Sequence, residues 1–386
     1  MNNTFRKILL AVSGLMLTLA LTFAGAHAQS AAAPAGAQAA PTVMTAGKDP
    51  QFKNIQVLKD LPSDQLLSAM QFITVSLGVQ CSACHVQVNG QWADEKDDKQ
   101  MKLAARHMMQ MQMDINKNNF NGNRQVTCNT CHRGSERPVG TPEILEKEGE
   151  RARPTPAAAP ATAPVLPTAD QLFSKYIDAI GGEAAVAKIT TRVEKGNTFV
   201  GENKTPIELY LKAPNKRMSI SHGQNGDSIT AFDGTAGWQG GGRGGARPMA
   251  PIDSMSAMID AALPFPTNLK TLFQQPRVRT DKIDDKEYYV VSGRGPGTPA
   301  QVRLYFDEQS SLLVRVVRLN DAGLGNMPVQ VDYTDYRDAD GIKIPFKWTL
   351  SRPQGRFSIQ VDSVQQNVPV DDAKFVKPAA PAAPAQ

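Results

Sequence analysis

"CSACH", residues 81–85, decides how the first third of the chain must fold, and the pattern returns as "CNTCH" at residues 128–132. The two pentapeptides use all four cysteines of the 386-residue chain. On a helical turn, cysteines three positions apart present both sulfurs to one side, where they can form thioethers with the two vinyl groups of a haem. The adjacent histidine then faces the iron. The pattern predicts two covalently attached haem c groups, with these attachment residues and proximal ligands: Cys81, Cys84, His85, Cys128, Cys131 and His132.

Other uses of paired cysteines fit less well. A zinc site would bring the two pairs together, but they lie far apart and each carries its own histidine. A thioredoxin-like motif needs one pair in a βαβ setting, whereas the surroundings here are helical. Spacing alone does not exclude structural disulfides.

A helix is predicted ahead of each motif. In "LPSDQLLSAMQFITVSLG", residues 61–78, either Ser63 or Asp64 can cap the helix, and Gly78 ends it. The residues expected on one apolar face are Leu66, Met70, Ile73 and Leu77. In "DDKQMKLAARHMMQMQMDIN", residues 97–116, the residues expected along the dominant apolar face are Met101, Met108, Met111 and Ile115.

Each iron needs a sixth ligand, and histidine is scarce. The chain has five histidines, of which His27 lies in the expected signal peptide, two are the expected proximal ligands and His222 lies far along the chain. Only His107 can therefore complete a bis-histidine site in this segment, so methionine supplies at least one axial position unless that position is open. Met70 is the only methionine of its helix and becomes the candidate for the first haem. Spacing does not choose between Met108 and Met111 for the second.

These residues resemble a known family. The order "SLGVQCSACH", "AARHM" and "VTCNTCHRGSERP" resembles the cytochrome c subunit of photosynthetic reaction centres over about residues 48–140. The resemblance implies electron transfer between redox partner proteins, Met70 as one distal ligand and Met108, which follows Ala105-Arg106-His107, as the other. The chain departs from the family in having two motifs rather than four, and in the different segment that follows them.

The ends and the middle of the chain are low in complexity. Basic residues precede an apolar run that ends in Ala26-His27-Ala28, which predicts a cleaved signal peptide and export to the periplasm. An uncleaved membrane anchor is the alternative. A net charge of +5 does not indicate a nucleic-acid partner. The expected division is signal peptide 1–28, disordered leader 29–47, all-α dihaem cytochrome domain 48–150, Pro/Ala linker 151–167, antiparallel β half-barrel-like domain 168–377 and disordered tail 378–386.

The second domain changes period. After a helix at "ADQLFSKYIDAIGG", residues 169–182, apolar and polar residues alternate, and residues 301–319 and 329–350 each predict a hairpin. We expect an α+β fold with a large curved antiparallel sheet, covered in part by a helix at 253–265. The glycine-rich run at 240–248 reads as an exposed loop. The stretches "KYIDAIGGEAA", "LKAPNKR", "FDGTAGW" and "DYRDADGIKIPF" resemble lipoprotein-carrier proteins, which implies a half-barrel around an apolar cavity and an apolar ligand.

Three functions follow from these features. Electron transfer is favoured, because six-coordinate irons leave no site for substrate, and no other catalytic group of residues is visible. The acidic run "ADEKDD", residues 93–98, reads as a solvated loop. A haem peroxidase or gas sensor would need an open iron position. A periplasmic carrier would use the second domain to hold its ligand.

Overall fold

The computed structural model describes residues 44–138, 165–241, 244–295 and 301–378. The expected signal peptide, most of the leader, most of the linker and nearly all of the tail lie outside these residues. The described part of the leader is folded, because Ala46 is buried and its N–H donates to the carbonyl of Leu61 at 2.8 Å. Among the described residues, none of the helices combines the length and the apolar character that a bilayer crossing requires.

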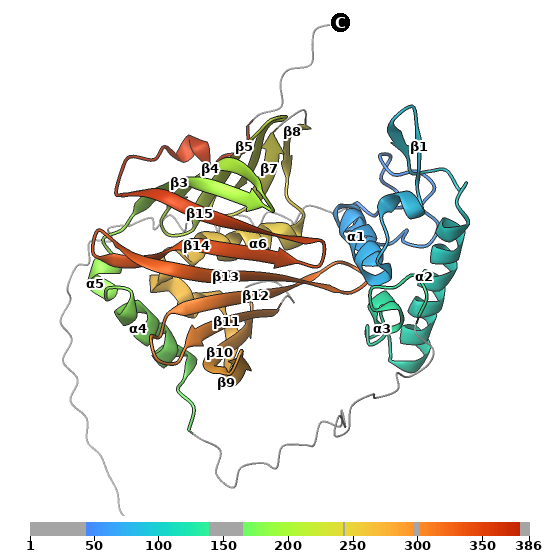
Figure 1. Ribbon diagram of the computed structural model, residues 1–386. Coiled ribbons are helices and arrows are strands. Elements are labelled where there is room, and N and C mark those ends of the chain that lie inside the picture. The colour runs from blue at the N-terminus through green and yellow to red at the C-terminus, as the bar shows by residue number, and fades with distance from the viewer. Residues whose placement is uncertain (1–43, 139–164, 242–243, 296–300, 379–386) are drawn as a thin grey trace, which may run out of the picture. The chain divides into compact units, whose positions relative to one another are not determined.

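The first segment is mainly helical. It is not the all-α domain that the sequence predicts. A short antiparallel hairpin follows the first cysteine motif, where Val86 pairs with Ala93. The elements, coloured blue to cyan in Figure 1, are η1 Ser63–Gln65, α1 Leu66–Leu77, η2 Cys81–Ala83, β1 Val86–Val88, β2 Gln91–Ala93, α2 Gln100–Asn119 and α3 Cys128–His132.

Helix α1 forms where the sequence predicts it and ends at Gly78, as predicted. Neither Ser63 nor Asp64 caps it, because Gln65 occupies the N-cap position without a side-chain hydrogen bond. Gly78 has φ +68°, and a Cβ there would lie 2.2 Å from the carbonyl oxygen of Gly134. The N–H of Gly134 in turn donates to the backbone carbonyl oxygen of Ser76 at 2.8 Å. The end of α1 is therefore fixed to the chain just beyond α3.

The packed face of α2 differs from the predicted one. Its buried residues are Lys102, Met109, Gln112 and Asn116. Met108 and Met111, expected on the dominant apolar face, are instead 41% and 44% exposed. The three polar residues can be buried because each one hydrogen-bonds backbone groups of nearby segments of the same chain. Hydrophobic period alone could not reveal this, since three of the four packed positions are polar.

The second segment is a 13-stranded antiparallel sheet in the described residues (Figure 1). Its order is β8-β7-β6-β5-β4-β3-β15-β14-β13-β12-β11-β10-β9, so the chain meanders outward on both sides of the β3–β15 pair. The strands are β3 Thr191–Val200, β4 Asn203–Lys212, β5 Lys216–Gly223, β6 Gly226–Phe232, β7 Gly237–Gly241, β8 Gly244–Pro248, β9 Gln274–Ile283, β10 Lys286–Arg294, β11 Gln301–Asp307, β12 Leu313–Asp321, β13 Asn326–Ala339, β14 Ile342–Arg352 and β15 Gly355–Gln366.

Helices cover one face of this sheet. They are α4 Ala169–Ala179, α5 Glu183–Val186, α6 Pro251–Ala262 and the 3₁₀ segment η3 Pro266–Leu272, and η4 Asp372–Lys374 follows the last strand. Phe173 of α4 is 1% exposed, and its ring lies 6.1 Å from those of Phe273 and Phe306. Both predicted hairpins form, as β11–β12 and β13–β14, and α4 and α6 match the predicted helices.

The sequence predicts an exposed loop for the glycine-rich run at 240–248. In the part of this run that the structure describes, the prediction is wrong. Gly237–Gly241 and Gly244–Pro248 pair as strands β7 and β8 at one edge of the sheet. Gly241 has φ +108°, and a Cβ there would lie 1.8 Å from the carbonyl oxygen of Asp227 on the neighbouring strand. Glycine is therefore required for the strand to approach so closely.

The turn between β12 and β13 packs against the first segment, within the compact unit formed by residues 43–386. Leu324 is buried in a cluster with Phe72 of α1. A Cβ on Gly325 would lie 2.2 Å from the Phe72 ring, so this contact is tight. Arg124 donates to both carboxylate oxygens of Asp321, at 2.7 and 2.6 Å. The contact thus combines apolar burial with a bidentate ion pair.

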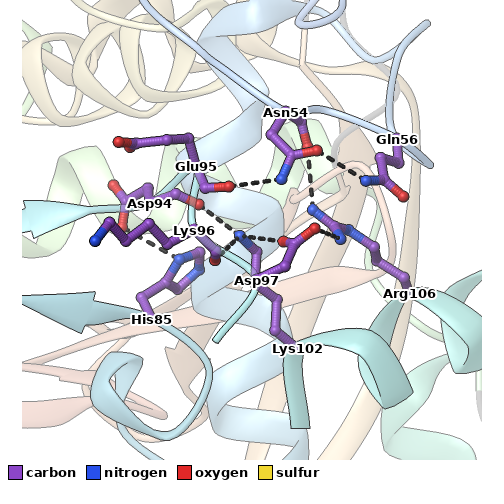
Figure 2. A network of polar contacts seen from close by, with 9 residues as sticks. All are labelled: Asn54, Gln56, His85, Asp94, Glu95, Lys96, Asp97, Lys102 and Arg106. Carbon is purple, nitrogen blue, oxygen red and sulfur yellow. Dashed lines mark hydrogen bonds and ion pairs between the residues drawn. The ribbon is translucent and has the colours of Figure 1, made fainter. Parts of the chain in front are cut away.

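A polar network fastens the loop ahead of α2 (Figure 2). The carboxylate of Asp97 accepts a hydrogen bond from Arg106 at 2.8 Å and lies 3.0 Å from the Lys102 amine. Lys102 also donates to the carbonyls of Asp94 and Lys96, each at 2.6 Å. Arg106 continues to the carbonyl of Asn54 at 3.1 Å. The sequence predicts a solvated loop for the acidic run at 93–98. The prediction is incomplete, because Lys102 and Arg106 of α2 bind the backbone of this run and the carboxylate of Asp97.

Replacement of Asp97 should destabilise the protein in a pH-dependent way. The hydrogen bond from Arg106, with others from Asn54 and Lys102, holds the pKa of the Asp97 carboxyl well below its usual range. A depressed pKa contributes stability above the unfolded-state value of about 4, and this contribution is lost as the pH falls towards the folded-state pKa. Asp97→Asn should therefore lower Tm at pH 7, and the difference from wild type should narrow below pH ~4.

The matched control is the exposed neighbour, Asp98→Asn. Thermal unfolding followed by circular dichroism at several pH values measures the effect. A Tm difference for Asp97→Asn that stays constant down to the acid limit would show that the carboxylate charge is not what stabilises the loop.

Candidate functional site

The first cysteine motif begins three residues after Gly78, the C-cap of α1. Cys81 to Ala83 form a 3₁₀ turn, and the N–H of His85 donates to the Cys81 carbonyl at 2.9 Å. In a 3₁₀ turn, side chains three positions apart are eclipsed, so Cys81 and Cys84 share one side. Cys81 is exposed and Cys84 is half-buried, and both are free thiols.

His85 has an acidic neighbour. Its Nδ1 atom lies 3.2 Å from Oδ1 of Asp94, although the two do not form an aligned hydrogen bond (Figure 2). The backbone carbonyl of Asp94 is held by Lys102 in the loop network. Because Nδ1 faces a carboxylate, Nε2 is the ring nitrogen left to bind a metal.

The second motif forms the short helix α3. A capping box between Thr127 and Thr130 starts it, and Arg133 ends it in the left-handed conformation, with φ +51°. Cys128 and Cys131 are three residues apart on this helix, hence on one side, and are also free thiols.

The Nδ1 atom of His132 lies 3.0 Å from the carbonyl oxygen of Ser135. A backbone carbonyl can only accept, so Nδ1 carries the proton and Nε2 is free for a metal. Each motif thus offers two thiols on one side and one histidine with Nε2 available. This arrangement fits a haem held by two thioethers and a proximal imidazole.

Side chains of α2 hold the chain in place ahead of the second motif. Asn116 Oδ1 accepts from the N–H groups of Gln125 and Val126 at 3.1 and 2.9 Å, and its Nδ2 donates to the Val126 carbonyl at 2.7 Å. Gln112 donates to the same carbonyl at 2.7 Å. These positioning residues were missed by sequence reasoning. Their signal was two amides one helical turn apart, an ordinary pattern on a solvated helix.

Several large apolar side chains of this segment are exposed. Among the described residues of this segment, the exposed large apolar side chains include Leu67, Val88, Trp92, Leu103, Met108, Met111, Met113 and Phe120. Each of these side chains is at least 38% exposed. Exposed apolar side chains of this kind could contact a large, flat, apolar prosthetic group.

The candidate distal ligands lie in different surroundings. Met70 is half-buried on α1 and packs against the same cluster as Cys128. On α2, Met108 precedes the buried Met109 and so borders the packed face. His107 and Met111 instead line a shallow surface depression together. The helix geometry therefore favours Met108 over His107 and Met111 as a residue close to the rest of the segment.

The sheet contains a separate cavity of about 420 Å³. Its apolar wall includes Ile207, Leu209, Leu211, Trp348, Phe357 and Ile359. The resemblance to lipoprotein-carrier proteins implies an apolar cavity, but this one also has charged residues in its lining: Arg192, Glu194, Arg217, Asp260, Lys343 and Arg352. The sequence suggested only the apolar half, because buried charges at alternate positions of a strand look like residues on a solvated face.

Comparison with known proteins relates the first segment to a family. Residues 15–162 match the family model described as photosynthetic reaction centre cytochrome C subunit. Curated photosynthetic reaction center cytochrome c subunits from Roseobacter denitrificans and Thermochromatium tepidum are similar, with 35% identity over 94 residues and 36% over 91 residues. Each match covers 22% of this chain, and they cover 25% and 22% of those relatives, respectively. The chain thus spans about a quarter of the length of these relatives.

Solved structures resemble the second segment at low identity. A LolA superfamily protein from Nitrosomonas europaea is 14% identical, with a TM-score of 0.40, and the match covers 55% of this chain and 99% of that one. A DUF1329 family protein from Desulfovibrio piger is 10% identical, with a TM-score of 0.38, and the match covers 54% of this chain and 96% of that one. The resemblance predicted from the motifs is confirmed: within residues 15–162, this chain is similar to the reaction-centre cytochrome c subunit family.

Proposed function

We propose that residues 48–150 form an exported dihaem c-type cytochrome domain that transfers electrons between redox partner proteins. The observation that carries this proposal is the repeated arrangement of two thiols on one side and a histidine whose Nδ1 lies within about 3 Å of an oxygen, which leaves Nε2 for the iron. Cys81 and Cys84 would hold one haem c, and Cys128 and Cys131 the other. A haem iron supplies reversible one-electron oxidation and reduction.

The axial ligands determine whether the irons carry electrons or bind substrates. His85 and His132 are the proximal ligands in this proposal, and Met70 and Met108 are the distal ones, as in the similar family. A methionine ligand raises the reduction potential relative to a second histidine. With both methionines bound, no coordination position remains open, so the domain passes electrons rather than transforming a substrate. A peroxidase or sensor would require one of them to be displaced.

The surroundings of the chain are part of the proposal. Cleavage of residues 1–28 would release the protein into the periplasm, where covalent haem attachment fits an exported protein. A Pro/Ala linker at 151–167 would join the two domains. The second domain favours a second candidate function, a periplasmic carrier with an attached redox domain, because the sheet contains a cavity of about 420 Å³.

Removal of each distal methionine tests the assignment. Met70→Ala and Met108→Ala should each convert one haem from low to high spin, because no other sulfur then occupies the axial position. Each variant should lose part of the weak near-red methionine–iron(III) absorbance band and keep the other part. Visible spectra of oxidised and reduced protein measure this.

Met111→Ala is the matched control, since Met111 lies on the same helix and is about as exposed as Met108. Its spectrum should equal that of wild type. A high-spin haem in wild-type protein would refute six-coordination and favour the enzyme or sensor. Loss of the band in Met111→Ala with its retention in Met108→Ala would exchange the two assignments.

The carboxylate beside His85 should tune the first haem. A negative charge near Nδ1 makes the imidazole a stronger donor and stabilises the oxidised iron. Asp94→Asn should therefore raise the midpoint potential of the haem at Cys81 and Cys84 by tens of millivolts, and leave the other potential unchanged. Spectroelectrochemical titration measures both potentials. Asp98→Asn is the control for general charge, and an equal shift in both variants would contradict a specific effect of Asp94.

A further inference from the structure

The cavity of the sheet contains an arginine without adequate partners. Arg192 on β3 is 3% exposed, and its Nε and Nη2 atoms form no hydrogen bond. Its Nη1 atom lies 3.6 Å from Oε1 of Glu194, which is too long for a hydrogen bond. A guanidinium has five N–H donors, and leaving them buried without acceptors is costly. This side chain therefore points to an acceptor that the chain itself does not provide.

Glu194 lies too far from Arg192 to satisfy its donors. It is 6% exposed, and burial raises the pKa of its carboxyl just as burial lowers the pKa of the Arg192 guanidinium. Arg217 lies on the same face, because Arg192, Leu211 and Arg217 are paired in register across β3, β4 and β5. The charged residues lining the cavity are Arg192, Glu194, Arg217, Asp260, Lys343 and Arg352. Of these, Lys343 and Arg352 are exposed, and Arg352 lies at the opposite end of the strands from Arg192. Asp260 is paired with Arg318. Beside Arg192, the charges that are at least half-buried are therefore two arginines, Arg192 and Arg217, and one carboxyl, Glu194.

The apolar wall begins beside these charges, where Leu209 pairs with Glu194, and continues over β4, β15 and β14. Ile207, Leu209 and Ile359 form a buried cluster against which Trp348 and Phe357 pack. The lining follows β3 from Arg192 to Val200, about 26 Å at the usual rise of a strand. The lining at the Arg192 end of β3 therefore carries two arginines, Arg192 and Arg217, against one carboxyl, and the cavity continues from there along an apolar surface. Its volume of about 420 Å³ falls in the range of small-molecule sites.

From this arrangement we propose that the cavity binds a single-chain amphiphile with an anionic head, such as a long-chain fatty acid. The carboxylate accepts the free Nε–H and Nη2–H of Arg192 in a bidentate pair, and the acyl chain lies against the cluster of Ile207, Leu209 and Ile359. A monoalkyl phosphate has the same chemistry, an anionic head on one apolar chain, and is distinguished by the test. This site is independent of the haem groups and goes beyond the proposed electron transfer.

Equilibrium binding to the full chain tests the proposal. Radiolabelled hexadecanoate is compared with hexadecanol, hexadecylamine and hexadecyl phosphate as competitors. Because a hydrogen-bonded charge pair should favour the acid, hexadecanoate should bind about tenfold more tightly than hexadecanol, and hexadecylamine should not compete. If hexadecyl phosphate binds more tightly than hexadecanoate, the natural head is a phosphate. If it binds more weakly, the natural head is a carboxylate.

The variants separate the head from the chain. The double variant Arg192→Met with Glu194→Gln removes both charges together, so that no carboxyl group is left buried without its partner. It should bind hexadecanoate about tenfold more weakly and hexadecanol as wild type does. Arg356→Met, an exposed arginine of the same sheet, is the matched control and should not change either affinity.

Two results would overturn the proposal. Equal affinity of wild type for the acid and the alcohol, or absence of binding by any amphiphile, would show that the cavity does not select an anionic head. An acid preference that survives in the double variant would show that Arg192 does not bind the head. The haem spectrum, which does not depend on this cavity, reports separately on electron transfer.

Discussion

The close approach of Gly78 to Gly134 is the constraint on which the cytochrome-like segment depends. The end of α1 contacts the chain directly after α3, at a distance that leaves no room for a side chain. The helix that carries Met70 is thereby held against the helix that carries the second cysteine motif. Residues more than fifty positions apart in sequence are thus fixed relative to one another by backbone contact.

Where α1 meets the sheet, a large side chain fills the space instead. The Phe72 ring occupies the space beside Gly325 in the β12–β13 turn, and Leu324 is buried in the same cluster. Arg124 and Asp321 add a bidentate pair between the segments. These contacts give the two segments a shared apolar surface.

Polar side chains of α2 hold the chain beside both cysteine motifs. Asn116 binds three backbone groups ahead of the second motif, and Lys102 binds two in the loop after the first. The two proximal histidines differ in their Nδ1 partners, a carboxylate for His85 and a backbone carbonyl for His132. In the proposed dihaem site this difference gives two similar motifs unequal electron affinities. Electrons would then have a preferred direction of transfer.

The sequence by itself determined the features that depend on neighbours along the chain. The cysteine motifs, the glycine that ends α1, and the β11–β12 and β13–β14 hairpins all follow from local spacing, turn residues and period. Their outcome does not depend on what packs against them. Spacing also limited the distal ligands to a few candidates, because histidine is scarce.

The tertiary structure decided which polar residues are buried. The buried face of α2 contains Lys102, Gln112 and Asn116 because backbone carbonyls and N–H groups from other segments satisfy them. Arg192 lies in the cavity because the strand register places it beside Glu194 and Leu211, whereas the sequence shows only an alternation of charge. A polar side chain is buried or exposed according to the partners that the rest of the chain brings to it, and those partners are distant in sequence.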